Sequence, residues 1–274
     1  MMPASMRTLI GEGTHAAPGA FNAAAAMLIE KGGFKALYIS GAGLSNSAGL
    51  PDTGLLSMDE AARFSSYIIR SVNIPAIVDV DTGFGGIPEV KGTVRIFEGL
   101  GAGAIQIEDQ EFPKRCGHLP GKRVIPAKDF AKKLDAAASA RENGEFLIIA
   151  RTDARAVEGM EGAIKRAKIY RDAGADVIFP EALEGKDEFR RFSDEVKAPL
   201  LANMTEFGRT PYMTLDEFGQ MNYSIVLFPM TCFRVAMKSM EAALTELKEK
   251  GTQKGLLGKM QTREELYRLL KYDV

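Results

Sequence analysis

The 274-residue sequence predicts an α/β fold and, within that class, a (β/α)₈ barrel of the TIM type. Eight short apolar or β-branched runs alternate along the chain with helix-like segments. Several runs follow a polar helix end and one or more glycines, as in EKGGFKALYIS, EGLGAGAIQIED and RDAGADVIFPE. Glycine there supplies a left-handed helix stop, and continuous apolar strands suit a parallel sheet that helices cover on both faces. Eight alternating strands favour the barrel over a doubly wound sheet, although periodicity alone does not exclude the latter.

The elements are expected at regular intervals. Two helices, 231–250 and 255–271, should follow the last strand, and the second carries an apolar face formed by Leu256, Leu257, Met260, Leu266, Leu269 and Leu270. Because no Pro/Ser-rich linker divides the chain, residues 1–274 are expected to form one domain, with 231–274 as additional C-terminal helices. The expected strands are 14–17 (the weakest), 36–40, 76–80, 104–107, 146–150, 176–179, 200–203 and 224–228.

Composition excludes several classes of protein. The chain has 35 basic and 36 acidic residues that are well mixed, which argues against partners such as nucleic acid or an anionic membrane. The first residues lack the apolar core of a signal peptide, and no apolar run approaches the length of a membrane span. Two cysteines are too few for a disulfide framework. These features predict a cytoplasmic enzyme.

Polar side chains follow nearly every expected strand. In barrel enzymes the active site is assembled at the C-terminal strand ends from residues of several strands. Packing does not explain such a concentration, so the sequence predicts an active site there. The groups are, in chain order, Ser40 and Gly41, Asp79 and Asp81, Glu108 and Asp109, Arg151 and Asp153, Glu181, Asn203 and Thr205, and Pro229 with Arg234.

Asp79, Asp81 and Glu108 are the candidate metal ligands. The two aspartates alternate along a strand and would point to opposite faces, but at a strand terminus both can approach one cation. An oxygen-only set with few protein ligands suits Mg²⁺, with Mn²⁺ as an alternative. The aspartates alone would fit helix capping or a buried salt bridge equally well.

The segment KRCGH at residues 114–118 places Cys116 among cations in a loop. Nearby cations favour thiolate over thiol, so this cysteine is a candidate for proton transfer. His118 is expected to orient or protonate the thiol. Cys232, flanked by apolar residues, is interpreted as a packed small hydrophobe.

Several groups are candidates for binding an anionic substrate. Guanidinium groups match carboxylates in a bidentate fork, and successive backbone amides form anion-binding turns. The segment SGAGLSNSAG lacks the glycine spacing of a nucleotide-binding loop, so no nucleotide site is expected. Tyr38, one residue from a strand end, either lines the substrate pocket expected at the strand ends or packs in the hydrophobic core. The candidates are Arg151 and Arg234, Asn203 and Thr205, and the amides of Ser40, Gly41 and Ala42.

With these residues in place, the sequence resembles the isocitrate lyase/phosphoenolpyruvate mutase superfamily and, within it, the 2-methylisocitrate lyases. The resemblance implies a Mg²⁺-dependent cytoplasmic lyase that cleaves the tricarboxylate 2-methylisocitrate to pyruvate and succinate in propionate breakdown. It also implies an α/β barrel whose late helix is swapped between subunits, usually in a homotetramer. The motifs occur in family order over almost the whole chain: YISGAG, LPDTG, VDVDTGFG, IEDQ, KRCGH, ARTDA, FPEA, NMTEFG, FPMTCFR, GTQK and MQTREELY.

Matching positions carry the family's roles to this chain. Asp79 and Asp81 become the metal carboxylates, and Glu108 reaches the ion directly or through water. Asp52, Lys114 and His118 also match active-site positions. The implied substrate-binding residues are Ser40, Gly41, Ala42, Cys116, Gly117, Arg151, Glu181, Asn203, Met204, Thr205, Arg234 and Arg263, with Tyr38, Phe179 and Leu227 beside them. Ala42 stands where relatives often carry a third glycine.

The implied chemistry is a retro-aldol cleavage in which Cys116 protonates the departing succinate enolate. The sequence does not identify the base that removes the hydroxyl proton. Isocitrate lyase is the nearest alternative, but those enzymes carry KKCGH and a tryptophan where this chain has Phe179, and this chain contains no tryptophan. Phosphoenolpyruvate and carboxyphosphonoenolpyruvate phosphonomutases are a second alternative, and true mutases lack a cysteine proton donor in this loop. A non-catalytic barrel, the third, would be expected to have lost some strand-end groups.

Overall fold

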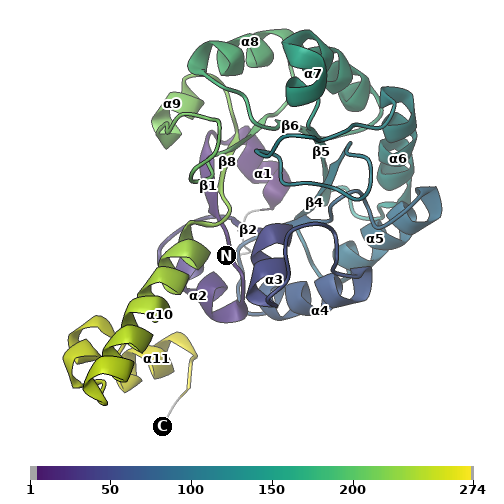
Figure 1. The fold of residues 1–274 in the computed structure, drawn as a ribbon. Helices are drawn as coiled ribbons and strands as arrows, with labels where there is room; N and C mark the ends of the chain where they lie inside the picture. The colour runs from purple at the N-terminus through teal and green to yellow at the C-terminus, as the bar shows by residue number, and fades with distance from the viewer. Residues whose placement is uncertain (1–4, 273–274) are drawn as a thin grey trace.

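Eight parallel strands form a barrel at the centre of the molecule, and the computed structural model describes residues 5–272 (Figure 1). Strands β2 to β6 pair in chain order, and β1, β8 and β7 form a second set. Two single bridges, Gly19 with Tyr38 and Ile178 with Leu200, join the sets and close the barrel. The predicted (β/α)₈ fold is therefore confirmed. The strands are β1 His15–Pro18, β2 Leu37–Ile39, β3 Ala76–Asp79, β4 Ala104–Glu108, β5 Leu147–Thr152, β6 Val177–Pro180, β7 Leu201–Asn203 and β8 Ile225–Phe228.

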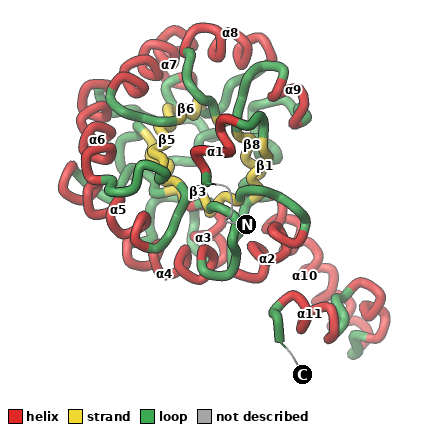
Figure 2. The backbone as a smooth tube through the Cα atoms, turned by 180° about the vertical axis from the view of Figure 1, so that it is seen from behind, coloured by secondary structure: helices red, strands yellow, loops and turns green. Residues whose placement is uncertain are grey.

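Helices surround the barrel, and α1 lies against one of its ends (Figure 2). Met6 and Leu9 of α1 pack into the apolar cluster that fills the barrel interior, so this end is closed. The helices are α1 Met6–Gly11, α2 Ala23–Lys31, α3 Gly41–Ser47, α4 Met58–Ile69, α5 Ile87–Gly99, α6 Ala127–Ala140, α7 Arg155–Asp172, α8 Lys186–Val196, α9 Leu215–Gly219, α10 Thr231–Lys250, the 3₁₀-helix η1 Lys254–Lys259, and α11 Arg263–Leu269.

Strand residues alternate between the interior and the helix-covered face. Tyr38 in β2 belongs to the interior cluster, whereas its neighbours Leu37 and Ile39 pack beneath the helices. Both faces are apolar, which explains why the strands are continuous hydrophobic runs in the sequence. Because all strands run parallel, their C-terminal residues meet at the same mouth, opposite α1. Glu108 and Arg151 are direct register partners at this edge.

The segment after β8, residues 231–272, is called the C-terminal arm here, and it differs from the prediction in one respect. The expected helix 231–250 coincides with α10, but the expected single helix 255–271 is wrong. The backbone of Met260 is extended, and a new helix starts directly after Thr262. The Thr262 side chain accepts a hydrogen bond from the Glu265 amide in a capping box. This strong N-cap, together with two glycines upstream, favours η1 followed by the short α11.

The arm projects away from the ring of helices (Figures 1 and 2). None of the α10 residues is buried in the single chain, and exposed apolar side chains such as Val235 and Leu244 lie along it. None of the helices within residues 5–272 is both long and apolar enough to cross a lipid bilayer.

Candidate active site

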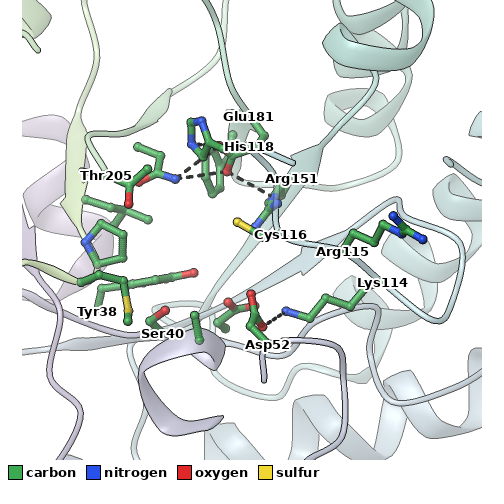
Figure 3. Close-up of a pocket in the computed structure, with 18 of the residues that line it drawn as sticks. Tyr38, Ser40, Asp52, Lys114, Arg115, Cys116, His118, Arg151, Glu181 and Thr205 are labelled. Atoms are coloured by element: carbon green, nitrogen blue, oxygen red, sulfur yellow. Dashed lines mark hydrogen bonds and ion pairs between the residues drawn. The ribbon is translucent and has the colours of Figure 1, made fainter. Parts of the chain in front are cut away.

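A polar cavity opens at the C-terminal mouth of the barrel (Figure 3). It receives side chains from six strand ends and from the loop that follows β4, as expected for a barrel enzyme. Most of the strand-end residues predicted from the sequence line it, whereas Asp109 and Asp153 are completely buried and do not. The lining residues are Tyr38, Ser40, Ala42, Asn46, Asp52, Asp79, Lys114, Arg115, Cys116, Gly117, His118, Arg151, Phe179, Glu181, Asn203, Thr205, Leu227, Pro229, Met230 and Arg234.

Asp79 and Asp81 converge on one point beside the turn after β2. Strand β3 ends at Asp79, and the left-handed φ of 48° at Asp81 turns the chain back, so strand alternation no longer separates the two carboxylates. A Cβ placed on Gly41 would lie 3.1 Å from Asp79 Oδ2 and 3.3 Å from Asp81 Oδ1. The amides of Gly41 and Asp81 each donate to Asp79 at 3.1 Å and fix its orientation. A side chain at position 41 would therefore have to displace one of the two carboxylates by a few tenths of an ångström.

Lys114 balances this negative charge. Its ammonium lies 2.6 Å from Asp81 Oδ1 and also donates to Asp52, which comes from the loop before α4. Burial raises the pKa of Asp81 to about 6, with Lys114 opposing and Asp79 reinforcing that rise. Burial also lowers the pKa of Lys114, but Asp81, Glu108 and Asp52 outweigh it and the net pKa is raised. The lysine therefore stays charged and compensates a crowded carboxylate group.

The residues present fit a Mg²⁺ ion. Mg²⁺ is usually held through one or two carboxylates with several waters, and the convergent aspartates supply that arrangement. Glu108 is fully buried, and its Oε1 has no hydrogen-bond partner within residues 5–272. A buried, unpartnered carboxylate oxygen is costly, and water held by a nearby ion would satisfy it. Within residues 5–272, no group of three or more His, Cys, Asp or Glu side chains is arranged to hold a metal ion by itself.

Arg151 lies among three acidic side chains at the cavity wall. Its Nε and one Nη form a bidentate pair with Asp153 at 3.0 and 3.1 Å, and its other Nη lies 3.2 Å from Glu108. Glu181 is 3.5 Å from Nε. All three guanidinium nitrogens therefore face carboxylates of the chain, which fix the side chain at the wall of the cavity. Arg234, the second expected clamp, is 47% exposed and lies 3.5 Å from Glu206.

Glu181, His118 and Asn203 form a connected group beside Arg151. The Arg209 amide donates to His118 Nδ1 at 3.0 Å, so the proton of the neutral ring resides on Nε2, which lies 2.9 Å from Glu181 Oε1. The Asn203 amide donates to both Glu181 oxygens at 3.3 Å. His118 is therefore positioned by Glu181 and the Arg209 backbone.

Glu181 should give the protein a measurable acid sensitivity. Burial opposes its ionisation, but Arg151 and His118 outweigh burial and lower the pKa to about 2, below the unfolded value of about 4.3. A depressed carboxyl stabilises the fold above the unfolded pKa and loses that effect as pH falls toward the folded pKa. We expect the stability advantage of wild type over Glu181→Gln to be complete at neutral pH and to shrink below about pH 4.5.

Urea unfolding at a series of pH values measures this difference. The Asp194→Asn variant, which changes an exposed carboxylate on α8, is the control and should follow wild type throughout. An advantage that grows on acidification would contradict the expected role of Glu181.

The loop carrying Cys116 presses directly on the Arg151 group. A Cβ on Gly117 would lie 2.5 Å from an Arg151 Nη and 2.5 Å from Glu181 Cγ, so only glycine fits. In Figure 3 the Cys116 sulfur points into the cavity beside Arg151, while Lys114 turns to Asp52 and Arg115 points away. The cations next to Cys116 in the sequence are thus directed elsewhere, and Arg151 is the cation drawn beside the thiol.

Three of the predicted substrate-binding residues, Gly41, Met204 and Arg263, do not line the cavity of this chain. The Met204 side chain packs in the outer apolar cluster, where its sulfur accepts the Met213 amide. Arg263 opens α11 in the projecting arm. Their roles stay predictions. Gly41, Asp81 and Glu108 adjoin the cavity through Asp79, Lys114 and Arg151.

Sequence reasoning named Pro229 after the last strand but did not select three lining residues: Asn46, Arg115 and Met230. Met230 comes two residues after β8, so the rule that strand ends build the site could have found it. Asn46 lies inside α3, where its face toward the cavity has no signal in the sequence.

A model of the family described as phosphoenolpyruvate phosphomutase matches residues 6–248. The chain belongs to this family. Its curated relatives include the 2-methylisocitrate lyase of Aeropyrum pernix, 56% identical over 256 residues that cover 93% of this chain and 82% of that protein. The 2-methylisocitrate lyase of Bacillus subtilis is 46% identical, with coverages of 93% and 84%. The family predicted from the sequence motifs is therefore confirmed.

Solved structures of the superfamily share the fold. A 2,3-dimethylmalate lyase, described as a PEP mutase/isocitrate lyase superfamily member, superposes with a TM-score of 0.90 at 34% identity, over 96% of this chain and 89% of that chain. A phosphonopyruvate hydrolase solved with oxalate and Mg²⁺ gives a TM-score of 0.88 at 29% identity, with coverages of 97% and 93%. The same family fold thus carries more than one reaction.

Proposed function

We propose that this chain is a Mg²⁺-dependent 2-methylisocitrate lyase that forms pyruvate and succinate. The observation that carries the proposal is one cavity lined by Asp79, Cys116 and Arg151, beside which Asp81 converges on Asp79. The identity to curated 2-methylisocitrate lyases supports this substrate over those of other superfamily reactions.

The metal would be held by Asp79 and Asp81, with Glu108 reaching it through water. Bound there, Mg²⁺ would act as a Lewis acid for the hydroxy-acid part of the substrate. The Mg²⁺ bound to the related phosphonopyruvate hydrolase supports this assignment. Within the chain, Lys114 neutralises part of the carboxylate charge, and the Gly41 amide holds Asp79 in place. Mn²⁺ could replace Mg²⁺ in such an oxygen site.

The remaining polar groups would bind the substrate carboxylates and assist cleavage. Loss of the hydroxyl proton lets the carbon–carbon bond break, which forms the ketone of pyruvate and leaves the electron pair on the succinate fragment. Arg151, the amides of the turn at 40–42, Asn203 and Thr205 would stabilise that enolate by charge and hydrogen bonds. Cys116 then transfers its proton to the enolate carbon, and the thiolate regains a proton from solvent.

The apolar wall of the cavity supports the choice of substrate. Phe179 and Leu227 line it beside Tyr38, and the Arg151 guanidinium lies 5.4 Å from the Phe179 ring centre. A phenylalanine leaves more room than the tryptophan of isocitrate lyases, so the extra methyl group of 2-methylisocitrate can be accommodated. One methyl group contributes only about 1–3 kcal/mol to discrimination.

The deciding experiment compares substrates with purified protein and Mg²⁺. We expect pyruvate release from 2-methylisocitrate to exceed glyoxylate release from isocitrate by about 10- to 200-fold in kcat/KM, the range that one methyl group allows. Phosphonopyruvate is the control substrate for the mutase reaction and should give no product. Comparable rates on both tricarboxylates, or turnover of the phosphonate alone, would contradict the proposed specificity.

We also propose that the chain acts as a single barrel domain over residues 1–274 in a cytoplasmic homotetramer whose late helix is swapped between subunits. The unburied α10 and its exposed apolar side chains support such an exchange. Arg263 would then reach a substrate only through this assembly, since it lies outside the cavity of its own chain.

A further inference from the structure

Lys122 is a buried lysine next to the candidate active site that the proposed chemistry does not use. It lies in the loop after β4, six residues beyond Cys116, and its side chain is 1% exposed. Its ammonium donates to the Gly117 carbonyl and to Asp153 Oδ1, the latter at 2.8 Å. A buried charge is tolerated only when it is paired and hydrogen-bonded, so these two contacts define the place of the side chain.

Asp153 connects Lys122 to Arg151. The carboxylate is completely buried, and Oδ1 accepts from Lys122 and from one Arg151 Nη, while Oδ2 accepts from Arg151 Nε. Its backbone amide donates to Asp109 at 2.9 Å, which anchors it to the end of β4. Lys122 and Arg151 therefore share one fixed carboxylate.

The hydrogen bond from Lys122 to the Gly117 carbonyl affects Cys116, because Gly117 is the next residue in the chain. The Gly117 peptide has no free space on the side of Arg151 and Glu181, as the 2.5 Å approaches of a hypothetical Cβ show. On the other side of the thiol, the Gln110 side chain bonds the amide and the carbonyl of Arg115, and the Leu119 amide donates to the Cys116 carbonyl at 3.0 Å. A lysine that holds the Gly117 carbonyl thus fixes the peptide next to the thiol.

We propose that Lys122 is a positioning residue. Its ammonium holds the Gly117 carbonyl close to Asp153 and so keeps the Cys116 thiol in its position beside Arg151. The proposal rests on the proposed function insofar as Cys116 is the proton donor. It predicts a specific defect. Without Lys122, Asp153 keeps its bidentate contact with Arg151, so substrate binding is preserved while the loop that carries the thiol is released.

The test compares Lys122→Met with Lys128→Met, which removes an exposed lysine at the start of α6. Hydrogen exchange should accelerate in peptides covering residues 111–122 and stay unchanged in β4 and β5, because only the loop loses its anchor. The kcat on 2-methylisocitrate should fall about 100-fold, as expected for a displaced catalytic group, with KM nearly unchanged. Lys128→Met should match wild type in both measurements.

A second variant, Lys122→Gln, keeps an N–H donor but loses charge and reach, and should show the same changes in smaller measure. Loop exchange and kcat equal to the Lys128→Met control in either folded variant would overturn the proposal. Faster exchange spread over the whole barrel, with unchanged kcat per folded molecule, would overturn it too, because Lys122 would then be merely structural. Inactivity of the wild type on 2-methylisocitrate would contradict the proposed function, while loop exchange would still decide the role of Lys122.

Discussion

Replacing Cys116 by serine is expected to lower kcat on 2-methylisocitrate about 1000-fold, within the range that a positioned general acid contributes. A hydroxyl is a much weaker acid than a thiol, so the enolate of succinate would wait for a proton from solvent. The fold should be unaffected, because Cys116 is only partly buried in a loop at the cavity and serine is nearly the same size. Steady-state kinetics with circular dichroism and thermal unfolding measure both effects.

Cys232→Ser is the matched control. Cys232 lies at the start of α10 and lines an apolar groove with Phe21 and Phe228, away from the polar cavity. This variant should keep wild-type kcat and KM. Near-full activity of Cys116→Ser would remove the thiol from the mechanism and would leave proton delivery to another group or to water.

The barrel could be predicted because its determinants are local. All eight strands fall on buried apolar runs, several of which follow a helix-ending glycine, and their ends differ from prediction by no more than two residues. The closure of the barrel depends instead on contacts between distant segments, namely the bridges Gly19–Tyr38 and Ile178–Leu200. Periodicity contains no information about such contacts, which is why the doubly wound alternative stayed open.

The part of the candidate site that could be predicted is the part whose residues lie at the C-terminal ends of strands. Asp79, Arg151, Glu181 and Asn203 lie at one mouth because parallel strands end there together. Side-chain pairing could not be predicted in the same way. The sequence placed Lys114 beside the thiol, whereas the structure pairs it with Asp52 and Asp81, residues 62 and 33 positions away.

Lys122 illustrates the same limit. In the sequence it is one more basic residue in a polar loop, and such lysines are usually solvated. Its burial depends on the shape of the loop and on Asp153, which directly follows β5. The second terminal helix was wrong for a related reason: its apolar spacing was read as one helix, although the Thr262 cap divides the segment.

Replacing Asp79 by asparagine is expected to abolish Mg²⁺ binding and to lower turnover at least about 1000-fold, since a Lewis acid contributes several kcal/mol to charge stabilisation. Both Asp79 oxygens accept backbone amides, from Gly41 and Asp81, and an asparagine NH₂ cannot accept. The variant therefore loses the orientation of the group together with its charge. Chelation of the metal with EDTA should abolish turnover by the wild type, and added Mg²⁺ should restore that turnover.

Thermal unfolding separates loss of the metal from loss of the fold. A ligand that binds only the folded state raises Tm, so Mg²⁺ should stabilise wild type and leave Asp79→Asn unchanged. Without metal, the variant should have less charge repulsion than wild type, because burial raises the pKa of Asp81 and the Asp79 carboxylate adds to that rise. Asp135→Asn, at an exposed position on α6, should behave as wild type. Retained Mg²⁺ stabilisation in Asp79→Asn would place the ion elsewhere and would contradict the carboxylate site on which the proposed chemistry depends.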